Sequence, residues 1–133
     1  MIVELNRFIG RSQLLAIKEA CRGEEGKYFR AMITDWAETI AKMPKTYETD
    51  GQGDEAPVTL HYFLGGSDWY IIEKDQEAEQ IQAFGFCCLN GNKVFAELGY
   101  TSIEEIIKYG AELDLYYKPE TLGEVLKRFK EAA

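Results

Sequence analysis

The chain contains a single histidine, His61, and two adjacent cysteines, Cys87 and Cys88, which are residue types used in nucleophilic catalysis. An imidazole beside a thiol can take up its proton and leave a nucleophilic thiolate. His61 and the cysteines lie in separate β-rich segments, so strand pairing could bring them together. Tyr62 and Trp69 would supply aromatic walls. One hypothesis is therefore a small enzyme or ligand-binding domain that uses His61 with Cys87 or Cys88.

The same residues are also typical of a packed sheet, and we favour that interpretation. The sequence lacks thiol-enzyme signatures, and His61 could equally be a hydrogen-bonded strand residue. Neighbouring strand residues point to opposite faces, so Cys87 and Cys88 neither bridge easily nor converge on one metal ion. With Cys21 the cysteine count is odd. We therefore predict three free thiols, no metal and no cofactor.

A second group of candidate residues is acidic. Four carboxylates alternate in sequence after the second β-rich segment, and two more alternate with leucines near residue 113. Paired carboxylates can perform acid–base catalysis, but without apolar shielding they stay ionised as a solvated rim. A dense row of carboxylates also resembles a short run of phosphates. We therefore predict six partner-binding residues: Glu73, Asp75, Glu77, Glu79, Glu112 and Asp114.

Charge is unevenly distributed along the chain, which has a net charge of −8. Residues 1–47 hold eight Lys/Arg and six Asp/Glu, whereas residues 48–133 hold seven and seventeen. Such an acidic surface repels nucleic acid and attracts basic proteins. Solubility alone is the alternative explanation of an acidic composition. We expect a basic protein partner and no direct contact with nucleic acid.

The length of 133 residues predicts one domain, 1–133, that can bury a core without disulfides or metal ions. No apolar run approaches the roughly 20 residues of a membrane helix. The first residues do not resemble a signal peptide. Together with the unpaired cysteines, these features predict a soluble, cytoplasmic protein that does not associate with membranes.

Two helices are predicted in the N-terminal part, residues 1–47. Ser12 is expected to cap the first, which begins at Gln13. Apolar residues at three- and four-residue spacings mark the second helix, and Pro44 ends it. This stripe is more typical of a core than of a ligand groove, and it consists of Phe29, Ile33, Trp36, Ile40 and Met43.

The rest of the chain predicts a sheet followed by helices. Strands are expected at 58–64, 68–74, 82–89, 96–100 and 112–117, separated mostly by glycine-rich turns. Ser102 with Glu105, and Thr121 with Glu124, form capping boxes that begin a short helix and a C-terminal helix. The predicted fold is α+β, with a mainly antiparallel sheet of about five strands, two N-terminal helices, one short helix and a C-terminal helix.

Three motifs occur in a familiar order within residues 57–126. They are WYIIE from Trp69 to Glu73, AFGFC from Ala83 to Cys87 and ELGYTS from Glu97 to Ser102. In this order they resemble an uncharacterised domain family, a domain of unknown function, found on bacterial plasmids, phages and integrated mobile elements. No activity or catalytic residue is attached to that family, so the resemblance implies a biological context and not a reaction.

The context implied by this resemblance is that of a mobile genetic element. Such elements carry small acidic proteins that block restriction or CRISPR nucleases by presenting carboxylates where the nuclease expects phosphates. We therefore expect a non-enzymatic, DNA-mimicking protein-binding module with an anti-defence role, either antirestriction or anti-CRISPR. Its expected partner is a basic, nucleic-acid-binding defence nuclease.

Overall fold

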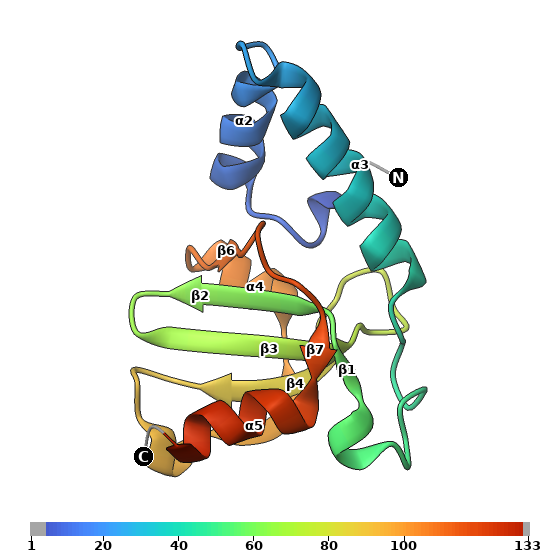
Figure 1. Cartoon of the computed structure of the whole chain (residues 1–133), viewed down its shortest axis with the longest axis vertical. Coiled ribbons are helices and arrows are strands. Elements are labelled where there is room, and N and C mark those ends of the chain that lie inside the picture. The colour runs from blue at the N-terminus through green and yellow to red at the C-terminus, as the bar shows by residue number, and fades with distance from the viewer. Residues whose placement is uncertain (1–4, 132–133) are drawn as a thin grey trace.

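A five-stranded antiparallel sheet lies at the centre of the computed structural model, which describes residues 5–131 (Figure 1). Its strands run in the order β5-β4-β3-β2-β6, and β1 pairs separately with β7. The predicted α+β fold with a mainly antiparallel sheet is confirmed. The strand bounds are β1 (Pro57–Val58), β2 (Leu60–Leu64), β3 (Ser67–Glu73), β4 (Ala83–Cys88), β5 (Glu97–Thr101), β6 (Glu112–Leu113) and β7 (Glu120–Thr121).

Four helices accompany the sheet within residues 5–131, namely α2 (Arg11–Ala20), α3 (Gly26–Lys42), α4 (Ile103–Lys108) and α5 (Leu122–Glu131). Short 3-10 turns form η1 (Gly53–Glu55) and η2 (Lys93–Phe95). None of the helices in this range is long and apolar enough to cross a bilayer. The chain termini at 1–4 and 132–133, which belong to the predicted 1–133 domain, lie outside the described residues.

The serine cap of α4 and the capping box of α5 form as predicted, because each depends only on residues three positions apart. The backbone N–H of Glu105 donates to Ser102 Oγ at 3.0 Å. Thr121 and Glu124 satisfy each other's backbone N–H groups, at 3.0 and 3.2 Å. The predicted cap of the first helix is wrong: α2 begins at Arg11 after Gly10, and no side chain caps it.

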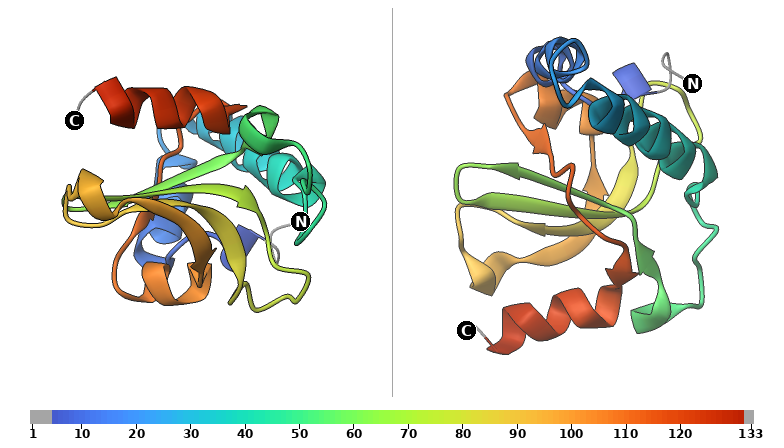
Figure 2. Two further views of the ribbon diagram at one scale, coloured as in Figure 1. Left: turned by 90° about the horizontal axis from the view of Figure 1, so that it is seen from below. Right: turned by 45° about the horizontal axis from the view of Figure 1, so that its top comes forward.

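The two faces of the sheet contribute to different hydrophobic clusters, so β3 is buried on both sides. The larger cluster joins one face to α2, α3 and α4, through residues such as Leu14, Trp36, Tyr62, Ile71 and Ile106. The smaller cluster lies under α5 and includes Val58, Tyr70, Ile72, Phe86 and Val125. Figure 2 (left) shows α5 over one face and α4 under the other.

A β-bulge interrupts the pairing of β3 with β4. Ile71 pairs with Gly85 and Glu73 with Phe84, which leaves Ile72 as the extra residue. The backbones approach closely at this point, because a Cβ at Gly85 would lie 2.1 Å from the carbonyl oxygen of Tyr70. The bulge shifts the alternation of β3 side chains between the two sheet faces by one residue. Alternation alone therefore does not predict the face on which Glu73 lies.

The fifth strand begins where it is predicted but is much shorter than the expected 112–117. β6 ends at Leu113, and the chain then turns, with the N–H of Tyr117 donating to the carbonyl of Asp114 at 3.2 Å. The Asp114 side chain accepts from the N–H of Tyr116 at 3.0 Å, which fixes the turn. The expected strand 58–64 is also divided, since Thr59 separates β1 from β2.

Candidate functional site

His61, on β2, lies between two carboxylates. Its Nε2 is 2.7 Å from Asp68 Oδ1, and its Nδ1 is 3.1 Å from Asp114 Oδ2. The ring stacks on Tyr70 with 4.6 Å between centroids, and the His61 side chain is only 14% exposed. Each ring nitrogen has a carboxylate oxygen within hydrogen-bonding distance. Neither nitrogen is left to activate a nucleophile.

A second layer of contacts closes this histidine cluster. The Tyr117 ring lies 5.5 Å from His61, and its hydroxyl donates to Glu120. Arg128 on α5 donates to both oxygens of Glu120, with Nη2 at 2.9 Å. The Arg128 guanidinium lowers the pKa of Glu120, and burial raises the pKa of Tyr117. The cluster therefore ties α5 and the segment before it to the sheet.

The histidine cluster does not converge on a point where a metal ion could bind. Asp68 and Asp114 contact different ring nitrogens of His61, which point in different directions. Within residues 5–131, no group of three His, Cys, Asp or Glu side chains is arranged to hold a metal ion.

The structure does not bring His61 to either cysteine, which corrects the alternative prediction of a histidine–thiol pair. His61 pairs with Tyr70, and the next residue across, on β4, is Phe86. Cys87 packs in the larger cluster on the opposite face. Cys88 pairs with Asp68, whose carboxylate is engaged by His61.

The two aromatic residues of the alternative ligand-binding hypothesis are core residues. Tyr62 is fully buried, and its hydroxyl donates to the carbonyl of Phe8. Trp69 is 8% exposed and packs in the larger cluster. A ligand-binding role for these two side chains would require the core to open.

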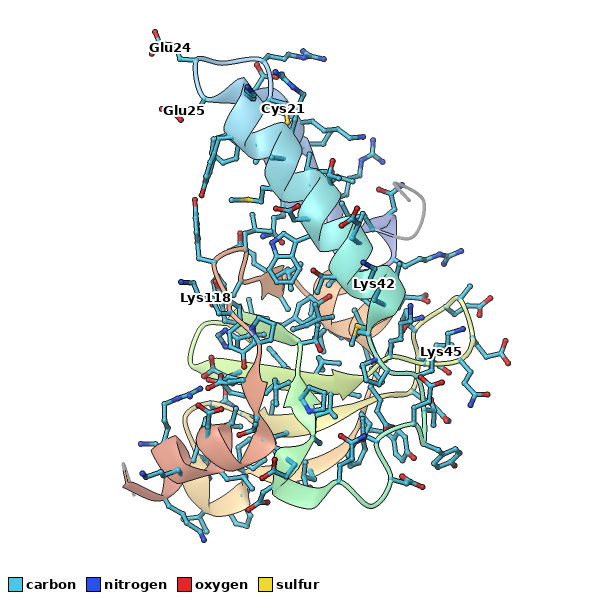
Figure 3. The ribbon with its side chains drawn as sticks, turned by 45° about the vertical axis from the view of Figure 1, so that its right-hand side comes forward. Cys21, Glu24, Glu25, Lys42, Lys45 and Lys118 are labelled. Atoms are coloured by element: carbon cyan, nitrogen blue, oxygen red, sulfur yellow. The ribbon has the colours of Figure 1, made fainter. Side chains whose placement is uncertain are left out.

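Burial makes both sheet thiols poor nucleophiles. Burial raises the pKa of Cys87 from 9.0 to about 11, with the charge of Glu97 adding to the effect. The pKa of Cys88 is also raised, by burial and then by Asp68. Cys21 lies at the turn between α2 and α3 (Figure 3).

We expect three free thiols, with slow reaction at Cys87 in the folded protein. Alkylation under denaturing, non-reducing conditions should label Cys21, Cys87 and Cys88. The number of labels is measured by mass spectrometry. In the native protein at neutral pH, the thiolate fraction of Cys87 should be about 100-fold lower than that of a thiol whose pKa is 9.0. Two missing labels, or native alkylation of Cys87 at the rate of the unfolded chain, would contradict this prediction.

Glu73 is not the exposed carboxylate that the sequence pattern predicted. It is 3% exposed, and its two oxygens accept from the backbone N–H groups of Tyr47 and Thr49 at 2.9 and 3.0 Å. The Thr49 hydroxyl donates to the same carboxylate. The prediction that Glu73 contacts a partner is therefore corrected, because this carboxylate holds the 45–50 loop.

Asp75 and Asp114 also hold loops together. The Asp75 carboxylate accepts from the backbone N–H groups of Glu77, Ile81 and Gln82, at 3.1, 3.1 and 2.9 Å. Burial alone would raise the pKa of Asp75, but these donors outweigh it and the pKa is lowered. Asp114 is bound to His61. Neither carboxylate is fully available to a partner.

The remaining predicted carboxylates are exposed, and the structure adds two more beside them. Glu77 and Glu79 lie in the 75–82 loop, whose Gln80 carbonyl accepts from the backbone N–H groups of residues 103 and 104 at 2.9 and 3.4 Å. This contact joins the loop to the acidic first turn of α4. We call Glu77, Glu79, Glu104 and Glu105 the acidic ridge. Glu112 is exposed on β6, outside the ridge.

No family model, curated protein or solved structure matches this chain. The resemblance to a family of mobile elements therefore remains a prediction from sequence motifs.

Proposed function

We propose that this chain is a non-enzymatic, acidic protein-binding module that engages a basic surface of another protein. The acidic ridge is the observation that supports this most. It consists of four exposed carboxylates from two segments, the 75–82 loop and α4. Hydrogen bonds to the Gln80 carbonyl join these two segments. The net charge of −8 favours approach of a basic partner.

The partner that best fits this chemistry is a protein that normally binds nucleic acid. Carboxylates spaced along a fixed surface can occupy sites built for phosphates, and they repel nucleic acid itself. Together with the motif resemblance, this favours a restriction or CRISPR nuclease as the target and inhibition as the outcome. Such nucleases act in the cytoplasm, so a cytoplasmic location belongs to the proposal.

A catalytic function is less well supported by the geometry. Both nitrogens of His61 contact carboxylates, and the pKa of Cys87 is raised to about 11. A substrate would have to displace Asp68 or Asp114 before His61 could act as a base. A His61→Ala variant therefore tests the catalytic alternative.

Neutralising the acidic ridge should weaken binding while leaving the fold intact. The test is competition: the protein is titrated into complexes of fluorescent DNA with each of a panel of restriction and CRISPR nucleases. We expect the wild type to displace DNA from at least one nuclease. Changing the four ridge glutamates to glutamine should weaken displacement by about tenfold or more, with the free energy of unfolding within about 0.5 kcal/mol of wild type. Displacement by the wild type should also weaken as salt rises.

A matched control changes four exposed glutamates of the helical N-terminal part to glutamine, and it removes the same charge. If the ridge is the contact surface, this control should displace DNA nearly as well as the wild type. The proposal is wrong if the ridge variant performs like the wild type while His61→Ala abolishes activity without unfolding the protein. The control positions are Glu19, Glu24, Glu25 and Glu38.

A further inference from the structure

The two edges of the sheet differ in how their backbone groups are satisfied. β6 is only two residues long, and the Gln13 side chain covers it. Its Nε2 donates to the Leu113 carbonyl at 2.7 Å, and its Oε1 accepts from the Leu113 N–H at 2.9 Å. The amide of Gln13 thus pairs with this edge as another strand would.

The opposite edge, β5, has no such cover. β5 is five residues long, and among residues 5–131 its backbone hydrogen bonds run only to β4. Alternate N–H and C=O groups of an edge strand point away from the sheet. Proteins usually protect such edges with proline, lysine, a bulge or a covering segment. The sequence ELGYT contains no proline or lysine, and its register with β4 is regular.

Apolar side chains are exposed along the same edge. Leu98 and Tyr100, which share one face of β5, are 43% and 53% exposed. Val94 and Phe95, in the preceding turn η2, are 86% and 76% exposed. Nothing lies within 4 Å of an ideal Cβ at Gly99, so the face of β5 opposite Leu98 and Tyr100 is open at this position. Unpaired backbone with alternating apolar side chains is the chemistry that takes up an extended peptide.

Charge identifies the kind of peptide. Glu97 begins β5, and Thr101 ends it two residues before the first turn of α4, where Glu104 and Glu105 of the acidic ridge lie. In a second copy paired antiparallel about Gly99, its Glu97 would face Thr101 and approach these glutamates. Like charges at that distance oppose pairing, whereas Lys or Arg at the ends of a strand would favour it.

We propose that β5 is a strand-addition site for an extended, basic segment of a protein partner. The segment would extend the sheet by hydrogen bonds to the outer edge of β5, with apolar residues against Leu98 and Tyr100. Its basic ends would lie beside Glu97 and the acidic ridge. This inference rests on the proposed function, because it specifies how the basic partner is held.

The test uses a synthetic peptide of alternating valine and threonine with two lysines at each end, blocked at both termini. Titration calorimetry gives its affinity, and NMR gives the exchange rates of backbone amides. We expect the peptide to slow exchange of outward-facing amides in 97–101 by about tenfold or more. A peptide of the same sequence with N-methylated alternate amides should neither bind nor protect, because it lacks the backbone donors.

A lysine on the edge provides the matched variant. Leu98→Lys places a cation beside the incoming lysines, and it should weaken peptide binding by about tenfold or more. Leu15→Lys is the control, because Leu15 on α2 is 54% exposed and lies on another element. It should bind the peptide like the wild type. Thermal denaturation verifies that both variants remain folded.

The outcomes separate this inference from the proposed function. Equal peptide binding by Leu98→Lys and wild type, or binding without protection of 97–101, would overturn strand addition. A further outcome is peptide binding that does not protect 97–101 and that is lost in the ridge variant. In that case the ridge binds the peptide by charge alone, and the proposed function stands without strand addition. Protection of 97–101 that increases with protein concentration in the absence of peptide would assign the edge to a second copy and would also overturn the inference.

Discussion

Replacing Trp36 by alanine is expected to lower the free energy of unfolding by about 3–5 kcal/mol. The Trp36 side chain, on α3, is 8% exposed and packs in the larger cluster. Its Nε1 donates to the carbonyl of Leu115 at 3.1 Å. Alanine would leave a cavity and remove the donor for that carbonyl. A domain of this size is stable by about 5–15 kcal/mol, so the loss would be a large share of the total.

Two variants on the same helix separate packing from the hydrogen bond. Trp36→Phe keeps most of the apolar contact and loses the donor, so its cost should be about 1–2 kcal/mol. Tyr28→Ala removes a side chain that is 51% exposed, and it should leave the urea denaturation midpoint unchanged. A wild-type midpoint for Trp36→Ala would show that Trp36 is not buried in solution. The groove of about 520 Å³ beside it, lined by Tyr28, Met32 and Tyr116, would then become a candidate partner surface.

Local patterns predicted the helices well, because the interactions that produce them lie within one or two turns. The stripe that contains Trp36 and the capping boxes at Ser102 and Thr121 all span few residues. The alternation and turns of 58–89 likewise predicted the central hairpin and its neighbour. These patterns determine which elements form and which of their faces is buried.

The candidate site depends on contacts between residues that are distant in the sequence. His61 and Asp114 are 53 positions apart, and Gln13 and Leu113 are 100 apart. The joining of the 75–82 loop to α4 rests on a backbone carbonyl, which leaves no trace in residue type. The glutamates of α4 form part of a predicted capping box, but the attachment of their helix to the 75–82 loop could not be predicted.

The row of alternating acidic residues does not form one exposed face, because alternation separates two faces only in an extended strand. β3 ends at Glu73, after the bulge, and residues 75–82 form a loop closed by the Asp75 carboxylate. Gln80 adopts a positive φ of 55° within that loop. In such a loop the two-residue spacing no longer determines where a side chain lies, so one predicted carboxylate is buried, one is engaged and two are exposed.

Removing the buried carboxylate should therefore damage the fold before it affects any partner. Glu73→Ala is expected to lower the free energy of unfolding by about 2–4 kcal/mol, because two backbone N–H groups and the Thr49 hydroxyl lose their acceptor. One of these N–H groups belongs to Tyr47, whose φ of 72° is unusual for a residue with a large side chain. Without Glu73 little would hold Tyr47 in that conformation.

The adjacent Lys74 makes the position of Glu73 more critical. Lys74 is 4% exposed, and its ammonium donates to the carbonyls of Ile40 and Ala41 at the end of α3, at 2.7 and 3.4 Å. The end of β3 therefore binds the end of α3 through one side chain and the following loop through the other. Loss of Glu73 should release the loop, and limited proteolysis should cut within 45–53 faster than in the wild type.

Comparison with Glu77→Ala distinguishes a structural carboxylate from a binding one. Glu77 is exposed in the neighbouring loop, so this variant should stay within about 0.5 kcal/mol of wild type in urea denaturation. Glu73→Gln should be intermediate, because the amide keeps one acceptor oxygen but directs its NH₂ group at a backbone donor. The contrary result is a Glu73→Ala variant that is as stable as the wild type but does not displace DNA from a nuclease that Glu77→Ala inhibits. Glu73 would then be a partner contact. Its burial would then describe only the unbound protein.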